Sequence, residues 1–275
     1  MTGAPTNLGI VALPFEVSTS FRKGTAHGPD AILEELDRLD GFDFRLGRDP
    51  FKGVPRTVVK AHGPEIVDAR IEQAVAGRVV SELLDSGGFP ICLGGEHTVS
   101  LGPIRAAHAR GELGVVQLDA HSDLRDAYEG NPLSHACVMR RVLDMDCRTL
   151  GLGIRSMCRE DAALVQERGL KVVPAWDISA GTDWWRLVDG LPERVYLTVD
   201  LDYFDPSDVP AVGTPEPGGP GWDETLAFIE YLFAVRNVVA ADIVELMPCA
   251  GDESSVRLAA RLLGFLVGLR FPLAG

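Results

Sequence analysis

The 275-residue sequence lacks cysteine pairs, long apolar runs and an excess of basic residues, and each lack excludes a class of protein. Its five cysteines are an odd number with no CxxC pair, which argues against a disulfide framework and against a structural zinc knuckle. We therefore expect reduced thiols in a cytoplasmic protein, with Cys92 and Cys249 in the apolar core. No run of about 18 apolar residues occurs and the first residues carry no basic segment, so we expect neither a membrane span nor a signal peptide.

The charge balance is strongly acidic. There are 26 Lys and Arg residues against 40 Asp and Glu residues, a formal net charge of −14. Such a chain is a poor electrostatic partner for nucleic acid or an anionic membrane, and it suits a cationic small molecule or metal ions better. A solvated acidic surface also explains much of this total. The hydrophobic share of 46% and the charged share of 24% are ordinary for a globular protein, which excludes disorder as the main state.

Short apolar runs alternate with amphipathic segments along the whole chain. Several runs are apolar at every position, as in strands buried on both faces, so the alternation predicts an α/β protein with a mainly parallel sheet. No linker or repeat interrupts this order, and we expect one domain over residues 1–275. The Pro- and Gly-rich stretch Pro206–Gly221 is expected to be a functional loop. The expected strands are Leu8–Leu13, Pro90–Leu93, Gly114–Leu118, Thr149–Gly153, Lys171–Val173, Arg194–Val199 and Val238–Val244, and the expected helices are Asp30–Leu39, Pro64–Leu84, Asp161–Glu167, Asp223–Val235 and Ser254–Leu269.

The segment DAHSD directly follows one of these apolar strands. Asp119, His121 and Asp123 alternate there with small residues. If the extended conformation continues, a period of two places all three side chains on one face. Two carboxylates and an imidazole so close together are costly unless a cation neutralises them, so the pattern favours a metal site over a capped polar strand end.

Three further predicted strands are followed by polar side chains of the same kinds. Ligand-binding crevices of open parallel sheets lie at the carboxyl ends of the strands, so we expect these side chains to meet the first group there. The residues concerned are His97, which emerges from a Gly-Gly turn, Asp200 and Asp202, which follow one strand at a spacing of two, and Glu245.

The candidate ligands are too many for a single ion. Four carboxylates and two imidazoles suit a pair of ions about 3.5–4 Å apart, bridged by shared carboxylates, as in two-metal hydrolytic sites. The absence of thiolate ligands favours a harder ion such as Mn²⁺ over structural zinc. Two divalent cations among four Asp residues also leave a site that accepts a cationic substrate better than a phosphate ester. The candidate ligands are His97, Asp119, His121, Asp123, Asp200 and Asp202.

Four motifs together resemble those of the ureohydrolase family of arginases and agmatinases, most closely the prokaryotic agmatinases, and the resemblance runs nearly from end to end. They are GGEH (Gly94–His97), DAHSD (Asp119–Asp123), SHA (Ser134–Ala136) and DLDYFDPSDVPAVGTPEPGG (Asp200–Gly219). The resemblance implies a three-layer α/β/α fold with a mainly parallel sheet of about eight strands. It also implies two Mn²⁺ per chain, with a bridging hydroxide that hydrolyses a guanidinium group to urea and an amine.

The resemblance also implies a role for each site residue. Four residues would hold each ion, namely His97, Asp119, Asp123 and Asp200 for one and Asp119, His121, Asp200 and Asp202 for the other, so that Asp119 and Asp200 bridge. Asp123 would pass a proton to the leaving amine, His135 would shuttle protons or steer the substrate, and Glu245 would pair with the guanidinium. Glu96 and Asp205 are expected to support the ligands from behind.

The segment Leu124–Ala136 bears on the choice of substrate. It offers Asp126 and Glu129 where arginases carry a dense set of hydroxyl and amide groups, and acidic residues repel a carboxylate and attract an ammonium; we expect Arg125 to be held in a salt bridge. Agmatine, hydrolysed to putrescine and urea, is therefore the first expectation. N1-aminopropylagmatine, giving spermidine and urea, is the main alternative, followed by arginase and guanidinobutyrase activity, and an inactive metal-binding homologue is the non-enzymatic one.

Two departures from the family pattern stand out. Glu96 replaces the usual Asp, and a longer side chain there could reposition His97; Ala136 stands where Gly is common.

Two other classes of metal enzyme fit the sequence less well. A two-metal phosphoesterase would need Arg or Lys inside the motifs, and a zinc deacetylase would not need Asp119 together with His97. The resemblance further implies a homotrimer or homohexamer.

Overall fold

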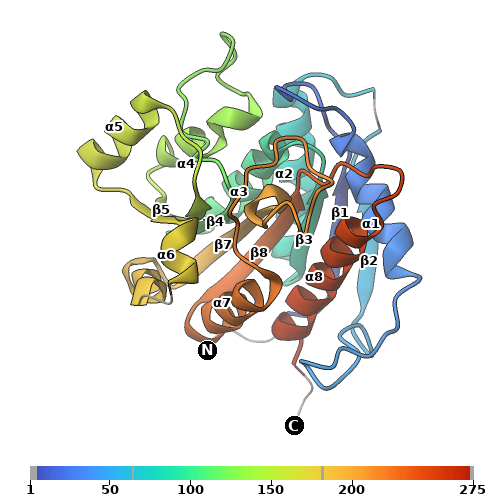
Figure 1. Ribbon diagram of the computed structural model, residues 1–275. Coiled ribbons are helices and arrows are strands. Elements are labelled where there is room, and N and C mark those ends of the chain that lie inside the picture. The colour runs from blue at the N-terminus through green and yellow to red at the C-terminus, as the bar shows by residue number, and fades with distance from the viewer. Residues whose placement is uncertain (1–4, 64, 181–182, 273–275) are drawn as a thin grey trace.

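The described residues form one eight-stranded sheet (Figure 1). The structure is a computed structural model that describes residues 5–63, 65–180 and 183–272. The strands are β1 (Leu8–Leu13), β2 (Arg56–Lys60), β3 (Phe89–Gly94), β4 (Gly114–Leu118), β5 (Arg148–Ile154), β6 (Lys171–Pro174), β7 (Arg194–Asp200) and β8 (Asn237–Val244). They lie in the order β2-β1-β3-β8-β7-β4-β5-β6, and every neighbouring pair is parallel. The predicted α/β class and parallel sheet are confirmed.

Helices cover both faces of the sheet. On one face lie α1 (Gly28–Leu36), α7 (Trp222–Val235) and α8 (Ser254–Arg270), and on the other lie α2 (Ala69–Asp85), α3 (Leu101–His108) and α4 (Val138–Leu143). Two further helices, α5 (Arg159–Arg168) and α6 (Ala175–Ser179), flank the β5–β6 edge. Alternate residues of the strands enter opposite cores, which is why the strands are apolar at every position. None of the helices in the described ranges is long and apolar enough to cross a membrane.

The seven predicted strands lie within a residue or two of their observed bounds, but β2 was not predicted. It is an edge strand that pairs with β1 alone, and most of its residues are exposed. An edge strand needs no apolar face on both sides, so RTVVK carries no clear period-two or all-apolar signal.

Two local expectations were wrong. The helix expected from Pro64 begins at Ala69, because the Asp68 side chain caps it by accepting a hydrogen bond from the Arg70 amide at 2.8 Å; residue 64 itself lies outside the described ranges. Cys92 is buried as expected, but Cys249 is exposed. It lies in a turn beyond β8 rather than in a strand, so its apolar neighbours in sequence do not cover it.

The order of the sheet explains where the chemistry lies. The four strands that precede the predicted site residues, β3, β8, β7 and β4, are direct neighbours at the centre of the sheet. Their carboxyl ends therefore form one continuous edge, which is where parallel sheets bind ligands.

Candidate metal centre

Asp119, His121 and Asp123 follow β4 in a bent segment, in which His121 forms an isolated parallel bridge with Ser156, and not in the continued extended strand that was expected. β4 ends at Leu118, and the amide of Ala120 donates to Asp202 Oδ1 at 3.0 Å. Asp123 has a φ of 50°, a left-handed backbone conformation that is uncommon for residues other than glycine. Such strained positions cluster at functional sites. Here the bent segment places the carboxylates of Asp119 and Asp123 beside the same neighbouring residue.

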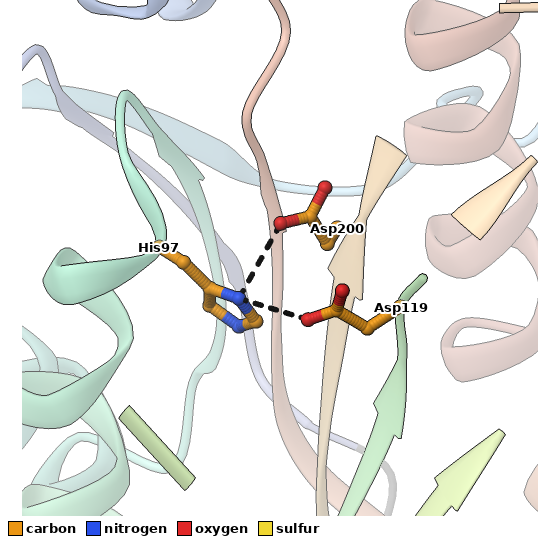
Figure 2. A group of neighbouring side chains, drawn as sticks. All are labelled: His97, Asp119 and Asp200. Carbon is orange, nitrogen blue, oxygen red and sulfur yellow. Dashed lines mark ion pairs between the residues drawn. The ribbon is translucent and has the colours of Figure 1, made fainter. Parts of the chain in front are cut away.

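That neighbour is His97. Its Nδ1 atom lies 3.2 Å from Asp119 Oδ2, 3.2 Å from Asp123 Oδ2 and 3.4 Å from Asp200 Oδ2 (Figure 2). Figure 2 shows the carboxylates of Asp119 and Asp200 converging on the imidazole from separate strands. The Nδ1 atom is buried, and no hydrogen-bond partner for it occurs among the described residues. A buried ring nitrogen that faces only carboxylates is the arrangement expected of a metal ligand.

A second group adjoins the first. His121 Nδ1 lies 2.9 Å from Asp202 Oδ2 and 3.8 Å from Asp119 Oδ1. The ligand atoms of Asp119, His121 and Asp202 all lie within 4.8 Å of one another, as do those of His97, Asp119 and Asp200. Asp119 therefore presents one oxygen to each group, Oδ2 to the first and Oδ1 to the second.

Hydrogen bonds behind His97 determine which ring nitrogen is free. His97 Nε2 lies 2.9 Å from the Thr198 hydroxyl, and that hydroxyl donates to Asp242 Oδ1 at 2.6 Å. Tyr196 donates to the other oxygen of Asp242 at 2.7 Å. Since Thr198 has a single proton and uses it for Asp242, it accepts from His97, and Nε2 carries the hydrogen. The lone pair of Nδ1 is then directed at the carboxylates.

The electrostatics of this cluster call for a cation. Burial, reinforced by the charges of Asp202 and Asp123, raises the pKa of Asp119 to about 7. Burial, with the charges of Asp202 and Asp119, also raises the pKa of Asp200 well above its usual value. Burial opposes ionisation of Asp202, but the hydrogen bond from His121 outweighs it and lowers the pKa of Asp202 to about 2. Carboxylates that repel one another in a buried site are stabilised by bound divalent ions. The donor set fits two divalent ions that would share Asp119.

Glu245 and His135 lie at the edge of the cluster. Glu245 has a φ of 65°, and its Oε1 atom accepts from the His97 amide at 2.7 Å and lies 3.9 Å from His135 Nδ1. The other oxygen faces Gly213, where an added Cβ would lie 3.8 Å from Oε2. Burial raises the pKa of Glu245 well above its usual value. The raised pKa reflects the cost of burying this carboxylate without a cation beside it.

The Glu96 carboxylate makes its hydrogen bonds with the 17–18 segment and with Thr98 and not with the His97 ring. It accepts hydrogen bonds from the amides of Val17 and Ser18 and from the hydroxyls of Ser18 and Thr98. Ala136 is partly buried, and its carbonyl accepts from the Arg125 amide at 3.2 Å. Neither departure removes a residue from the two groups.

The 206–221 loop is attached to the site by Thr214 and Arg155. Thr214 donates to Asp202 Oδ2 at 3.0 Å. Arg155 donates to six backbone carbonyls, which lie near the end of β5, in the segment after β7 and in the loop itself: those of Gly153, Asp202, Tyr203, Phe204, Glu216 and Pro217. Asp205 accepts from the amides of Ser207 and Gly218, so its support for the site acts through the loop.

The segment Leu124–Ala136 differs from expectation at its charged residues. Asp126 is paired with Arg141 at 2.7 Å and with Arg140 at 3.9 Å, so its charge is largely neutralised. The Arg125 guanidinium, expected in a salt bridge, lies 5.2 Å over the Tyr128 ring. Glu129 is exposed, with a φ of 49°.

Sequence reasoning missed several residues that hold the ligands. Apart from Thr214, which lies within the Asp200–Gly219 motif but was given no role, they are polar side chains inside apolar strands or outside the motifs, and for those in strands the odd polar residue was the available signal. Gln117, for example, donates to Asp119 Oδ2 at 2.8 Å. The missed residues are Ser18, Gln117, Arg155, Tyr196, Thr198, Thr214 and Asp242.

Comparison with known proteins agrees with this geometry. The Arginase family matches residues 6–268. The N(1)-aminopropylagmatine ureohydrolase of Synechocystis sp. is 38% identical over 93% of this chain and 88% of its own, and the agmatinase of Pyrococcus horikoshii is 33% identical over 94% and 90%. The agmatine ureohydrolase structure from Thermoplasma volcanium superposes with a TM-score of 0.87 at 33% identity, over 97% of this chain and 90% of that one.

A parallel α/β fold with two histidine–carboxylate groups at the carboxyl ends of its central strands has the arrangement of a hydrolase with a candidate metal centre. The chain belongs to the arginase family of ureohydrolases, whose members act on guanidino compounds.

Proposed function

We propose that this protein hydrolyses the guanidinium group of agmatine to putrescine and urea with two Mn²⁺ bound. The observation that carries the proposal is the position of Asp119, which presents one oxygen to each of two histidine–carboxylate groups. One ion would bind at His97, Asp119, Asp123 and Asp200, and the other at Asp119, His121 and Asp202, with Asp200 as a second bridge. When bound, the two ions supply the Lewis acidity that activates water at neutral pH.

The remaining residues would bind the substrate and move its proton. Glu245 pairs with the guanidinium, because its carboxylate is buried and one of its oxygens faces the space beside Gly213. Asp123 would take up the proton that the attacking water loses and pass it to the departing amine, from its place 3.2 Å from His97. His135, beside Glu245, steers the substrate or exchanges protons with solvent, since its side chain is partly exposed.

N1-aminopropylagmatine is a second candidate substrate. The relative at 38% identity carries that name, and the agmatinase of Pyrococcus horikoshii is 33% identical. Both substrates are cations without a carboxylate, in keeping with the net charge of −14 and the exposed Glu129. The pairing of Asp126 with Arg141 leaves Glu129 as the acid of this segment to test for contact with a distal ammonium.

A urea-release screen of the Mn²⁺-loaded protein tests the proposal. Agmatine, N1-aminopropylagmatine, arginine, guanidinobutyrate and formimidoylglutamate are compared at equal concentrations. We expect the first two to give the highest kcat/KM, with agmatine first. Faster urea release from arginine than from either amine would contradict the proposal. A cytoplasmic location and a trimeric or hexameric assembly remain predictions, to be tested by fractionation and by light scattering.

A further inference from the structure

Glu96 is a fully buried carboxylate that directly precedes the candidate ligand His97 in sequence, and within the described part of the chain its hydrogen bonds go to other residues than the candidate ligands' side chains. Its Oε2 atom accepts from the amides of Val17 and Ser18 at 2.7 and 2.6 Å. Its Oε1 atom accepts from the hydroxyls of Ser18 and Thr98, each at 2.7 Å. Four donors offset the cost of burying this charge.

The Ser18 hydroxyl connects Glu96 to His135. It donates its one proton to Glu96 Oε1, so it can only accept in its contact with the His135 amide, at 2.9 Å. Ser18 and His135 are 117 residues apart in sequence. The hydroxyl therefore fixes the start of the 3₁₀ turn His135–Cys137 relative to the end of β3.

The loop that carries Ser18 is itself held against the β3 turn. The Glu96 amide donates to the Phe15 carbonyl at 2.9 Å, and an added Cβ on Gly95 would lie 2.1 Å from that carbonyl oxygen. Only glycine allows this approach. The loop is thus packed on the turn that delivers His97, and it transmits the position of that turn to His135.

We propose that Glu96 and Ser18 are positioning residues for His135, holding its backbone through the Ser18 hydroxyl so that its imidazole lies beside Glu245. The inference rests on the role given to His135 in the proposed function. The residue after Gly95 is then Glu because a carboxylate must reach the amides of the 15–18 loop, a span that the shorter Asp would not cover without moving the loop. The imidazole itself lies with Nδ1 3.9 Å from Glu245 Oε1 and its ring 6.3 Å from that of Tyr128.

The test compares S18A with T98A in the Mn²⁺-loaded protein. Each variant removes one hydroxyl donor from the same Glu96 oxygen, but of these two hydroxyls it is that of Ser18 that accepts a hydrogen bond from the His135 amide. Residue-resolved hydrogen–deuterium exchange should show faster exchange of the His135 amide in S18A and no change in T98A. Unchanged exchange in S18A would overturn the inference, whether or not the protein releases urea.

Kinetics test whether the contact acts through His135. We expect S18A to lower kcat/KM for agmatine about tenfold, the effect of one lost hydrogen bond, with metal content unchanged and S18T restoring the rate. In an H135N background the S18A effect should shrink below about twofold, because its target is gone. An undiminished effect in that background would contradict the inference. Failure of the wild-type protein to release urea would contradict the proposed function, and the exchange measurement would still decide the contact.

Discussion

His97 Nε2 lies 2.9 Å from the hydroxyl oxygen of Thr198, a residue of β7 that is fully buried. Because Thr198 donates to Asp242, this contact requires a hydrogen on Nε2 and leaves Nδ1 free for a metal ion. The tautomer of His97 is therefore determined by a side chain that no motif contains.

Replacing Thr198 by Val should weaken metal binding. The valine side chain of T198V has nearly the same volume but cannot accept a hydrogen bond from His97. We therefore expect Mn²⁺ affinity to fall about 10- to 100-fold, the usual effect of removing a residue that hydrogen-bonds a metal ligand. Calorimetric titration of the metal-free protein measures this. The matched control is T225V, which removes a buried hydroxyl that donates to the Gly221 carbonyl at 2.7 Å, away from the metal centre. Equal affinity in T198V and T225V would show that Thr198 does not orient His97.

Replacing Glu245 should weaken substrate binding and leave metal binding unchanged. In E245Q the amide oxygen can still accept from the His97 amide, but the charge that faces the guanidinium is lost. We expect both ions to stay bound and kcat/KM for agmatine to fall on the order of 100-fold, mainly through KM, because a buried charge pair is broken. Metal analysis and steady-state kinetics check this. Loss of metal in E245Q would instead make Glu245 part of the metal centre.

Arg155 should stabilise the loops around Asp202. A Lys side chain cannot replace a guanidinium that donates to six carbonyls, so R155K should lower the free energy of unfolding by about 2–4 kcal/mol and weaken metal binding at the Asp202 side. Chemical unfolding measures the first effect. The control R148K alters an exposed arginine that donates to the Gly190 carbonyl, and it should change stability by no more than about 0.5 kcal/mol. A similar loss in both variants would refute the special role of Arg155.

A buried pair outside the site should make stability depend on pH. Glu72 is fully buried 3.8 Å from His62, and burial raises the pKa of Glu72 to about 7 although His62 opposes the rise. Burial disfavours protonation of His62, but its ion pair with Glu72 and its hydrogen bond to the Gly63 carbonyl outweigh this and raise the pKa of His62. Both folded-state pKa values are raised, so both groups contribute most at low pH and lose that stability as pH rises.

The variant E72Q removes the titrating carboxyl group of the pair formed by Glu72 and His62. Between pH 4.5 and 8 the free energy of unfolding of the wild type should fall relative to E72Q by about 3 kcal/mol, the linkage for a pKa shifted from 4.5 to about 7. Unfolding of both proteins across this pH range tests it, and the metal centre is common to both. Parallel pH profiles for the two proteins would show that Glu72 does not titrate in this range.

The sequence predicts the chemistry of this protein better than the geometry that holds it. His97, Asp119 and Asp200 were recognisable because each follows an apolar strand, and burial on both faces made those strands visible. The order of the strands, which brings β3, β8, β7 and β4 together, has no local signature. It depends on packing between segments far apart in the chain.

The residues behind the ligands were missed for a different reason. Asp242 lies inside β8, where a period-two or all-apolar pattern treats one polar residue as an exception. Ser18 lies in a loop, and its link to His135 exists only in three dimensions. Cys249 shows the converse error, since apolar neighbours in sequence did not make it buried.

The measurement that tests the account most directly is the Mn²⁺ content of the wild type and of D119A, taken together with urea release from agmatine. Asp119 presents an oxygen to each group, so its loss should disturb both sites at once. We predict about two Mn²⁺ per wild-type chain, and in D119A the joint loss of metal and activity. The control D30A removes an exposed carboxylate that pairs with Lys60 and should change neither. Activity retained in D119A, or a wild type that binds a single ion, would contradict a centre built around Asp119.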